Sequence, residues 1–129
     1  MPMSGSQPCP CGTGERYDRC CGPLHRGELR PDTAAALMRS RYSAFAVGAV
    51  DYLWRSWHPS TRPNRVDPDP GTVWTGLEIL DVVAGQPGDE RGEVEFRAHH
   101  RDPAGLPGVL HARSRFAVRA GRWLYLDDA

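Results

Sequence analysis

Four cysteines carry the clearest chemistry in this 129-residue chain. They lie within thirteen residues, as two pairs at the ends of one short loop: Cys9, Cys11, Cys20 and Cys21. Two such pairs can bring four thiolates to one tetrahedral metal ion, and Zn²⁺ suits a closed, all-sulfur site. Gly12 and Gly14 allow the backbone to turn tightly after the first pair. The spacing therefore predicts a structural zinc site, with an iron–sulfur cluster and with disulfides or free thiols as alternatives.

A second group of residues has side chains that could line a pocket for a small molecule. These candidates are Arg41, Trp57, His58, Glu95 and Arg113. An enzyme needs a general acid or base with a positioned partner, and no two of these residues have the spacing of a catalytic motif. His58 fits equally well as a cap at a helix end. Glu95 fits equally well in a cross-strand charge pair with Arg113 or Arg97.

Arg41 is unusual because it falls in the apolar arc of a predicted helix, beside Leu37. One interpretation is a side chain whose stem lies along the edge of that arc and whose head reaches water. The other is a buried guanidinium, which needs a partner because an isolated charge in the interior is very costly. In that case we expect the partner to be Glu78, Asp81 or Glu95, or a ligand anion in a pocket.

Two helices are expected in the first half of the chain. Apolar residues at helical spacing predict a first helix that begins at Asp32 or Thr33 and ends at Gly48. The same pattern predicts a second helix from residue 49 or 50 to Trp57, where the following His-Pro pair ends it. Prolines then make residues 60–71 a loop with little regular structure.

From residue 73 onward the apolar period changes to two, which is typical of strands with one covered face. We predict four strands, roughly Thr75–Val83, Glu93–His100, Leu110–Val118 and Arg122–Asp127. Helices followed by an antiparallel meander indicate an α+β fold, with the helices packed on one sheet face. The expected division is a tail and zinc knuckle at 1–31 and an α+β domain at 32–129. We expect the two parts to be energetically separable, because only the second can hold an apolar core of its own.

The cysteine-rich segment resembles a known zinc-binding motif. Cys9-Pro-Cys-Gly-Thr-Gly-Glu-Arg-Tyr-Asp-Arg-Cys-Cys-Gly22 resembles the SEC-C motif, the zinc-binding tail of the SecA translocation ATPase. By this resemblance the four cysteines correspond to the metal ligands, and His25 is a weaker candidate because four thiolates already complete the shell. In SecA the motif is implicated in protein contacts, helped by basic residues, whereas Glu15 and Asp18 dilute the basic charge here.

The rest of the chain resembles the YchJ-like family. The segments that carry this resemblance include Thr33-Ala-Ala-Ala-Leu-Met-Arg-Ser-Arg-Tyr-Ser-Ala-Phe45, Trp57-His-Pro-Ser-Thr-Arg62 and Trp74-Thr-Gly-Leu-Glu-Ile-Leu80. The family joins an N-terminal SEC-C motif to a domain similar to nuclear transport factor 2. The resemblance therefore implies a cone of helices against a curved antiparallel sheet, often around a pocket. It implies a fold and a metal but no reaction.

The charge balance and the distribution of apolar residues argue against two kinds of partner, nucleic acids and membranes. The 16 basic and 16 acidic residues balance, which argues against strong nonspecific binding to nucleic acid. No stretch approaches the roughly 18 apolar residues of a membrane span, and the first residues lack the apolar core of a signal peptide, so we expect a cytoplasmic protein without a membrane partner. A protein partner, a small-molecule ligand or a second copy of the chain in a homodimer is compatible with these features.

Two classes of function follow. In the first, zinc stabilises a small docking surface and the chain is a noncatalytic interaction or adaptor module. In the second, the cone holds a small-molecule site, and the chain is an isomerase, dehydratase or hydrolase. The fold does not choose between them. A pocket in which polar groups converge would favour the enzyme, and a cone filled by Trp54, Trp57 and Phe116 would favour the module.

Overall fold

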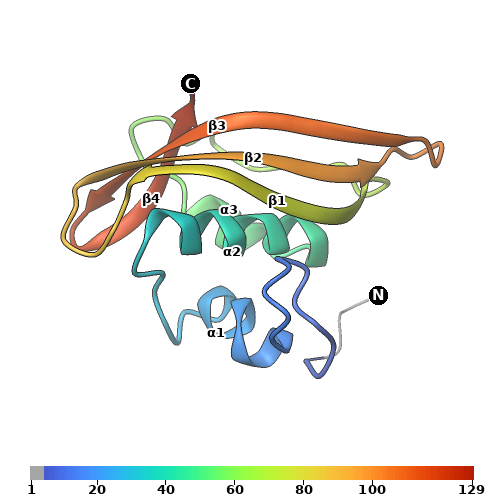
Figure 1. The fold of residues 1–129 in the computed structure, drawn as a ribbon, viewed down its shortest axis with the longest axis horizontal. Coiled ribbons are helices and arrows are strands. Elements are labelled where there is room, and N and C mark those ends of the chain that lie inside the picture. Colours follow the sequence, from blue (N-terminus) through green and yellow to red (C-terminus); the bar gives the residue numbers. More distant parts are fainter. Residues whose placement is uncertain (1–4) are drawn as a thin grey trace.

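The computed structural model describes residues 5–129 as helices packed on one side of a single curved sheet, with a cysteine-rich knuckle on the helical side (Figure 1). The elements in chain order are a 3₁₀ helix (Tyr17–Arg19), α1 (Cys21–His25), α2 (Ala34–Val47), α3 (Val50–Arg55), β1 (Val73–Ala84), β2 (Arg91–Arg101), β3 (Pro107–Arg119) and β4 (Arg122–Asp128). The predicted α+β architecture is thus confirmed. Residues 1–4 of the expected N-terminal region lie outside the described residues.

The sheet is an antiparallel meander in which the strands lie in the order β1-β2-β3-β4. All four predicted strands are present, each a little longer than the alternation indicated. Along β2 the side chains of Val94, Phe96 and Ala98 are buried against the helices, while the residues between them face the opposite side. One covered face and one charged face follow directly from this period of two.

Helix α2 is the main element packed on the sheet. It begins where the Thr33 side chain accepts a hydrogen bond from the Ala36 N–H at 3.0 Å, and it ends at Gly48, which takes the left-handed conformation with φ 79°. Its apolar side joins the inner faces of the strands in one core. This core contains Ala34, Leu37, Met38, Tyr42, Val94, Phe96, Ala98, Phe116 and Trp123.

One local expectation was wrong. The second helix ends at Arg55 and not at Trp57, because Trp57 leaves it to form a parallel bridge with Tyr125 of β4. In the knuckle, Gly22 and Pro23 lie in the short helix α1. Proline is compatible with the first turn of a helix, where its missing N–H would have no partner.

None of the helices within residues 5–129 is long and apolar enough to cross a bilayer.

Candidate metal centre

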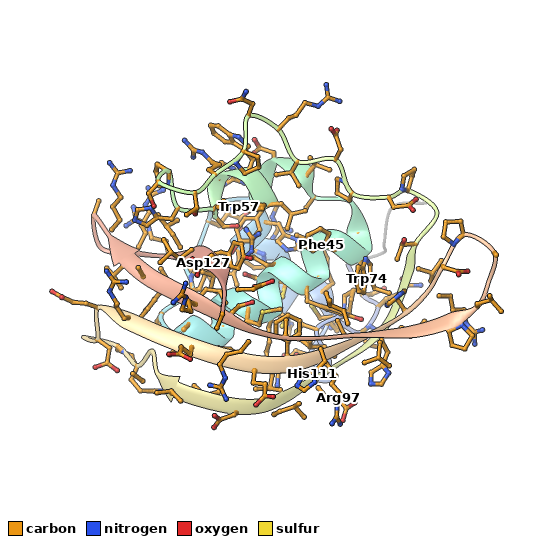
Figure 2. All side chains as sticks on the ribbon, turned by 90° about the horizontal axis from the view of Figure 1, so that it is seen from above. Phe45, Trp57, Trp74, Arg97, His111 and Asp127 are labelled. Atoms are coloured by element: carbon orange, nitrogen blue, oxygen red, sulfur yellow. The ribbon has the colours of Figure 1, made fainter. Side chains whose placement is uncertain are left out.

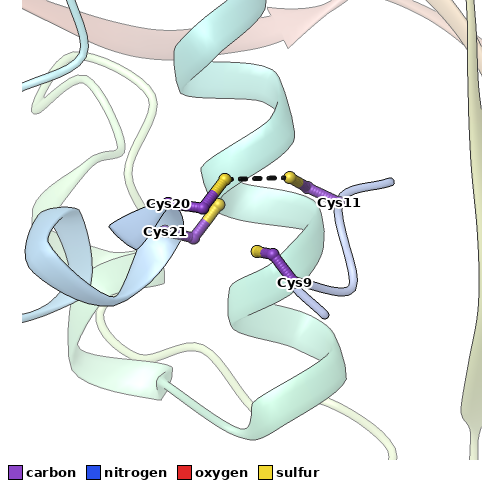
Figure 3. A group of neighbouring side chains, drawn as sticks. All are labelled: Cys9, Cys11, Cys20 and Cys21. Atoms are coloured by element: carbon purple, nitrogen blue, oxygen red, sulfur yellow. Dashed lines mark hydrogen bonds between the residues drawn. The ribbon is translucent and has the colours of Figure 1, made fainter. Parts of the chain in front are cut away.

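The four cysteine side chains converge on one point at the surface of α2 (Figure 3). Their sulfur atoms all lie within 4.8 Å of one another, and the Sγ atoms of Cys11 and Cys20 are 3.5 Å apart. All four cysteines are free, without a disulfide between them. Three of them are buried, and Cys20 is partly exposed. The structure therefore forms one compact all-sulfur cluster from residues that are close in sequence.

The backbone of the knuckle positions these sulfurs. Pro8 and Arg16 form a short antiparallel bridge, and the Cys9 N–H donates to the Glu15 carbonyl at 2.8 Å. Gly12, with φ 86°, reverses the chain after the first pair of thiols. Tyr17 packs against the cysteine cluster.

Burial and mutual hydrogen bonding set the acidity of the thiols. The neighbouring Cys21 and Cys9 thiols donate to Cys11 and hold its pKa far below the usual value, whereas the same contact with Cys11 raises the pKa of Cys21. Burial raises the pKa of Cys20 to about 11. A divalent cation would allow all four thiols to be deprotonated.

The donor set fits a single Zn²⁺ ion. A Zn–S distance of about 2.3 Å in a tetrahedron places the sulfurs about 3.8 Å apart. The spacing of the cluster, from 3.5 Å for Cys11 and Cys20 up to at most 4.8 Å, brackets this value. A cluster of several irons needs a wider cage, because metals and bridging sulfides lie between its cysteines. The four cysteines would hold Zn²⁺ as a closed structural ion, with no position left for substrate.

His25 is not part of this sulfur cluster. Its Nε2 donates to the Ser40 carbonyl of α2 at 2.8 Å, and its Nδ1 therefore accepts from the Tyr17 hydroxyl at 2.6 Å. Burial lowers the pKa of His25. The ring is thus a neutral link between the knuckle and α2.

Two arginines of the helical layer also bind the knuckle. Arg39 of α2 donates to the Cys11 carbonyl at 2.6 Å, and Arg55 of α3 donates to the His25 carbonyl at 2.9 Å. Neither contact was expected from the sequence, because both join a side chain to a backbone carbonyl in a distant segment. Together with the His25–Ser40 hydrogen bond, these contacts dock the knuckle on the helices.

We expect His25→Gln to weaken this docking without loss of metal. The variant loses the bridge between Tyr17 and Ser40, so the free energy of unfolding in urea should fall by about 1 kcal/mol. Metal content should stay at about one zinc per chain. His58→Gln is the matched control, because the His58 ring accepts hydrogen bonds from Ser60 in a local turn and does not contact the knuckle. Loss of zinc from His25→Gln would instead identify the ring as a ligand.

Arg41 lies buried on the inner side of the sheet, with 5% of its surface exposed. Its Nη1 donates to the Leu53 carbonyl at 2.8 Å and to the Ser56 hydroxyl at 2.7 Å. The guanidinium carbon lies 4.5 Å from the centre of the Tyr125 ring and 5.2 Å from that of Trp57. Burial lowers the pKa of Arg41 to about 10.

The expected pairing of Arg41 with Glu78, Asp81 or Glu95 is wrong. These acids face the opposite side of the sheet, where Glu78 binds His99, and Asp81 and Glu95 bind Arg113. The solvated interpretation is also wrong, because the head is buried. Neutral acceptors and aromatic faces take the place of a carboxylate around this cation.

The other pocket candidates lie on two faces of the sheet. Trp57 packs on Tyr125 on the inner side, and Figure 2 shows Trp57 on the side opposite Arg97 and His111. Glu95 and Arg113 are register partners on the outer face, with Arg113 Nη2 3.1 Å from Glu95 Oε1. This cross-strand charge pair was one of the predicted interpretations and is confirmed.

His58 follows α3 on the inner side and orders the turn that leads away from it. Its N–H donates to the Tyr125 carbonyl at 2.7 Å, and its Nδ1 accepts from the Ser60 N–H at 3.1 Å. The five candidates therefore do not meet in one pocket. Tyr125, which contacts both Arg41 and Trp57, was missed, although its alternation with Trp123 marks it as facing inward.

The fold and the cysteine cluster define a protein that joins a SEC-C motif to an NTF2-like domain. The model of the SEC-C motif matches residues 6–23, and that of the YchJ middle NTF2-like domain matches residues 33–128. The chain therefore belongs to the YchJ-like family. The curated proteins that are similar to it in sequence include several named UPF0225 proteins.

Relatives and solved structures agree with this family. The UPF0225 protein SCO1677 of Streptomyces coelicolor is 53% identical over 120 residues, which cover 93% of each chain. The solution structure of RPA3114, a SEC-C motif containing protein from Rhodopseudomonas palustris, matches with a TM-score of 0.83 and 33% identity, covering 95% of this chain and 98% of that one. A crystal structure of a SEC-C motif containing protein from Psychrobacter arcticus matches with a TM-score of 0.79 and 30% identity, covering 97% of this chain and 84% of that one.

Proposed function

We propose that this protein is a zinc-stabilised, noncatalytic interaction module. The observation that carries the proposal is the closed sulfur cluster: four cysteine sulfurs within 4.8 Å of one another supply a complete tetrahedral shell. A catalytic zinc keeps one position for water or substrate and is typically held by three protein ligands. The ion at this site would fix a docking surface instead of activating a reactant.

The arrangement of the remaining polar groups supports the same proposal. Glu95 and Arg113 are engaged in an ion-pair network on the outer face, and His58 orders a turn. General acid–base catalysis needs such groups to converge on one substrate position. Because the sheet separates them, the small-molecule enzyme is the less favoured candidate.

Substitution of Co²⁺ for the native ion tests whether the site is closed. Four thiolates around Co²⁺ give intense sulfur-to-metal charge-transfer absorption, and a complete shell should leave the ligand-field bands unchanged when imidazole is added. Cys20→Ser loaded with excess Co²⁺ is the matched control. Cys20 is the partly exposed ligand, so removing its sulfur leaves three sulfurs and a position that imidazole can reach, and the bands should respond. A response of the unmodified protein would demonstrate an open position and contradict the proposed structural role.

A further inference from the structure

A cavity lies between the knuckle, α3 and β4, away from the cysteine cluster. Its volume is about 130 Å³, and its apolar wall includes Leu29, Leu37 and Trp123. Apolar cavities of about 150 Å³ hold a group of the size of benzene. Leu29 is 61% exposed at this site, which leaves an apolar side chain available for contact. The cavity can thus accept one apolar side chain.

The charged side chains that line this cavity are all positive. Arg30, Arg55 and Arg122 are among its lining residues, and no acidic residue is. Arg55 is already engaged with Asp51. Neither Arg30 nor Arg122 forms an ion pair with another residue of 5–129. In a chain of zero net charge, this local excess favours an anion.

A buried cation adds to this excess from behind the cavity wall. Ser56 lines the cavity, and its hydroxyl accepts from Arg41. Arg41 donates to neutral acceptors and packs on aromatic rings, and the carboxylate whose charge acts on it, Asp128, forms no ion pair with it. Because little water screens a buried charge, it acts on a ligand in the adjoining cavity more strongly than a surface arginine would.

The edge of β4 supplies backbone groups at the same place. Tyr125 directs its N–H to the Ser56 carbonyl and its carbonyl to the His58 N–H, both away from β3. Peptide groups along a strand alternate in direction, so the N–H and carbonyl of Trp123, two residues earlier, point to this same edge. Trp123 lines the cavity, where its carbonyl can accept a hydrogen bond from a ligand amide.

We propose that this cavity binds the carboxyl terminus of a protein partner that ends in an apolar residue. The last side chain enters the apolar cavity, the terminal carboxylate is bound by Arg30 and Arg122, and the last amide N–H pairs with the edge of β4 at Trp123. This site deepens the proposed interaction function and rests on it. The site would select a ligand that carries three groups together: a carboxylate, an apolar side chain and a backbone amide.

Calorimetric titration of the zinc-loaded protein with acetyl-Gly-Ala-Leu, carrying a free carboxylate, tests the proposal. We expect saturable binding that weakens at least tenfold when the peptide is amidated at its C-terminus. Arg122→Gln and Arg30→Gln should each weaken binding about five- to tenfold, since each removes one charge-assisted contact. Arg119→Gln, one hairpin turn away from Arg122, is the matched control and should bind normally.

Hexanoate separates a chain terminus from a free organic acid. Hexanoate has a carboxylate and an apolar chain but no amide. Because it cannot pair with the edge of β4, we expect it to bind at least tenfold more weakly than the peptide. Equal affinity for hexanoate and peptide, equal affinity for acid and amide, or no binding of the peptide would each overturn the proposal. Any of these results leaves the Co²⁺ spectrum unchanged, so failure of this site is distinct from failure of the zinc-stabilised module.

Discussion

Cys11→Ser is expected to reduce the zinc content of the purified protein from about one ion per chain to nearly none. Cys11 is fully buried, and its sulfur lies at the centre of the hydrogen bonds among the thiols. A hydroxyl cannot replace the thiolate as a zinc ligand here, and a structural zinc site contributes folding energy directly. Metal analysis of protein expressed without added zinc measures the change. Thr13→Ala is the control, because it removes a hydroxyl beside Cys20 but keeps all four sulfurs.

The same variant, or chelation of the unmodified protein, should disorder the knuckle and leave the sheet folded. Amide signals from residues 8–25 are expected to collapse, while those of β1–β4 remain dispersed. The melting temperature should fall by about 5–10 °C, because the docking contacts of His25, Arg39 and Arg55 contribute about 1–2 kcal/mol to the remaining domain. The division at residues 31 and 32 stays a prediction until this is measured, and a cooperative loss of the whole sheet would contradict it.

Arg41→Ala is expected to lower the free energy of unfolding by about 3–4 kcal/mol. The substitution leaves a cavity between Tyr125 and Trp57 and deprives the Leu53 carbonyl and Ser56 hydroxyl of their donor. Urea unfolding followed by the tryptophan fluorescence measures the loss. The expected cause is packing and hydrogen bonding, since Arg41 forms no ion pair with a carboxylate within residues 5–129.

A second substitution at the same position separates packing from charge. Arg41→Met keeps most of the buried stem and removes a charge that is costly to bury, so the expected loss is only about 1–2 kcal/mol. Arg97→Ala, on the exposed outer face, is the control and should change stability by less than about 0.5 kcal/mol. If Arg41→Met and Arg41→Ala lower the free energy of unfolding equally, the polar contacts of the guanidinium, and not the packing of its aliphatic stem, stabilise this region.

Local patterns in the sequence were sufficient to predict the helices and strands and the convergence of the four cysteines. The period of two along β2 defined that strand and its inner face, and Thr33 and Gly48 marked the ends of α2. All four cysteines belong to one short loop, so their convergence depends on few unknown torsions. These features could be predicted because the interactions that create them are close in the chain.

The surroundings of Arg41 could not be predicted in the same way. Its helical phase correctly placed it on the buried arc, yet its neighbours come from the end of α3 and from β4. The short helix ends early because Trp57 pairs with Tyr125, a contact between distant segments. Periodicity indicates which side of an element is buried, but it does not indicate which distant element lies against it.

The sequential order of the strands has a consequence for how the protein is made. Each strand pair of the sheet is a hairpin between neighbours in the chain, so the sheet can grow by local steps and needs no distant segment to begin. The sulfur cluster is even more local, and Cys21 leaves the ribosome before any part of α2. Metal uptake can therefore precede the emergence of the helix on which the knuckle docks, and a loaded knuckle would meet α2 as that helix leaves the ribosome.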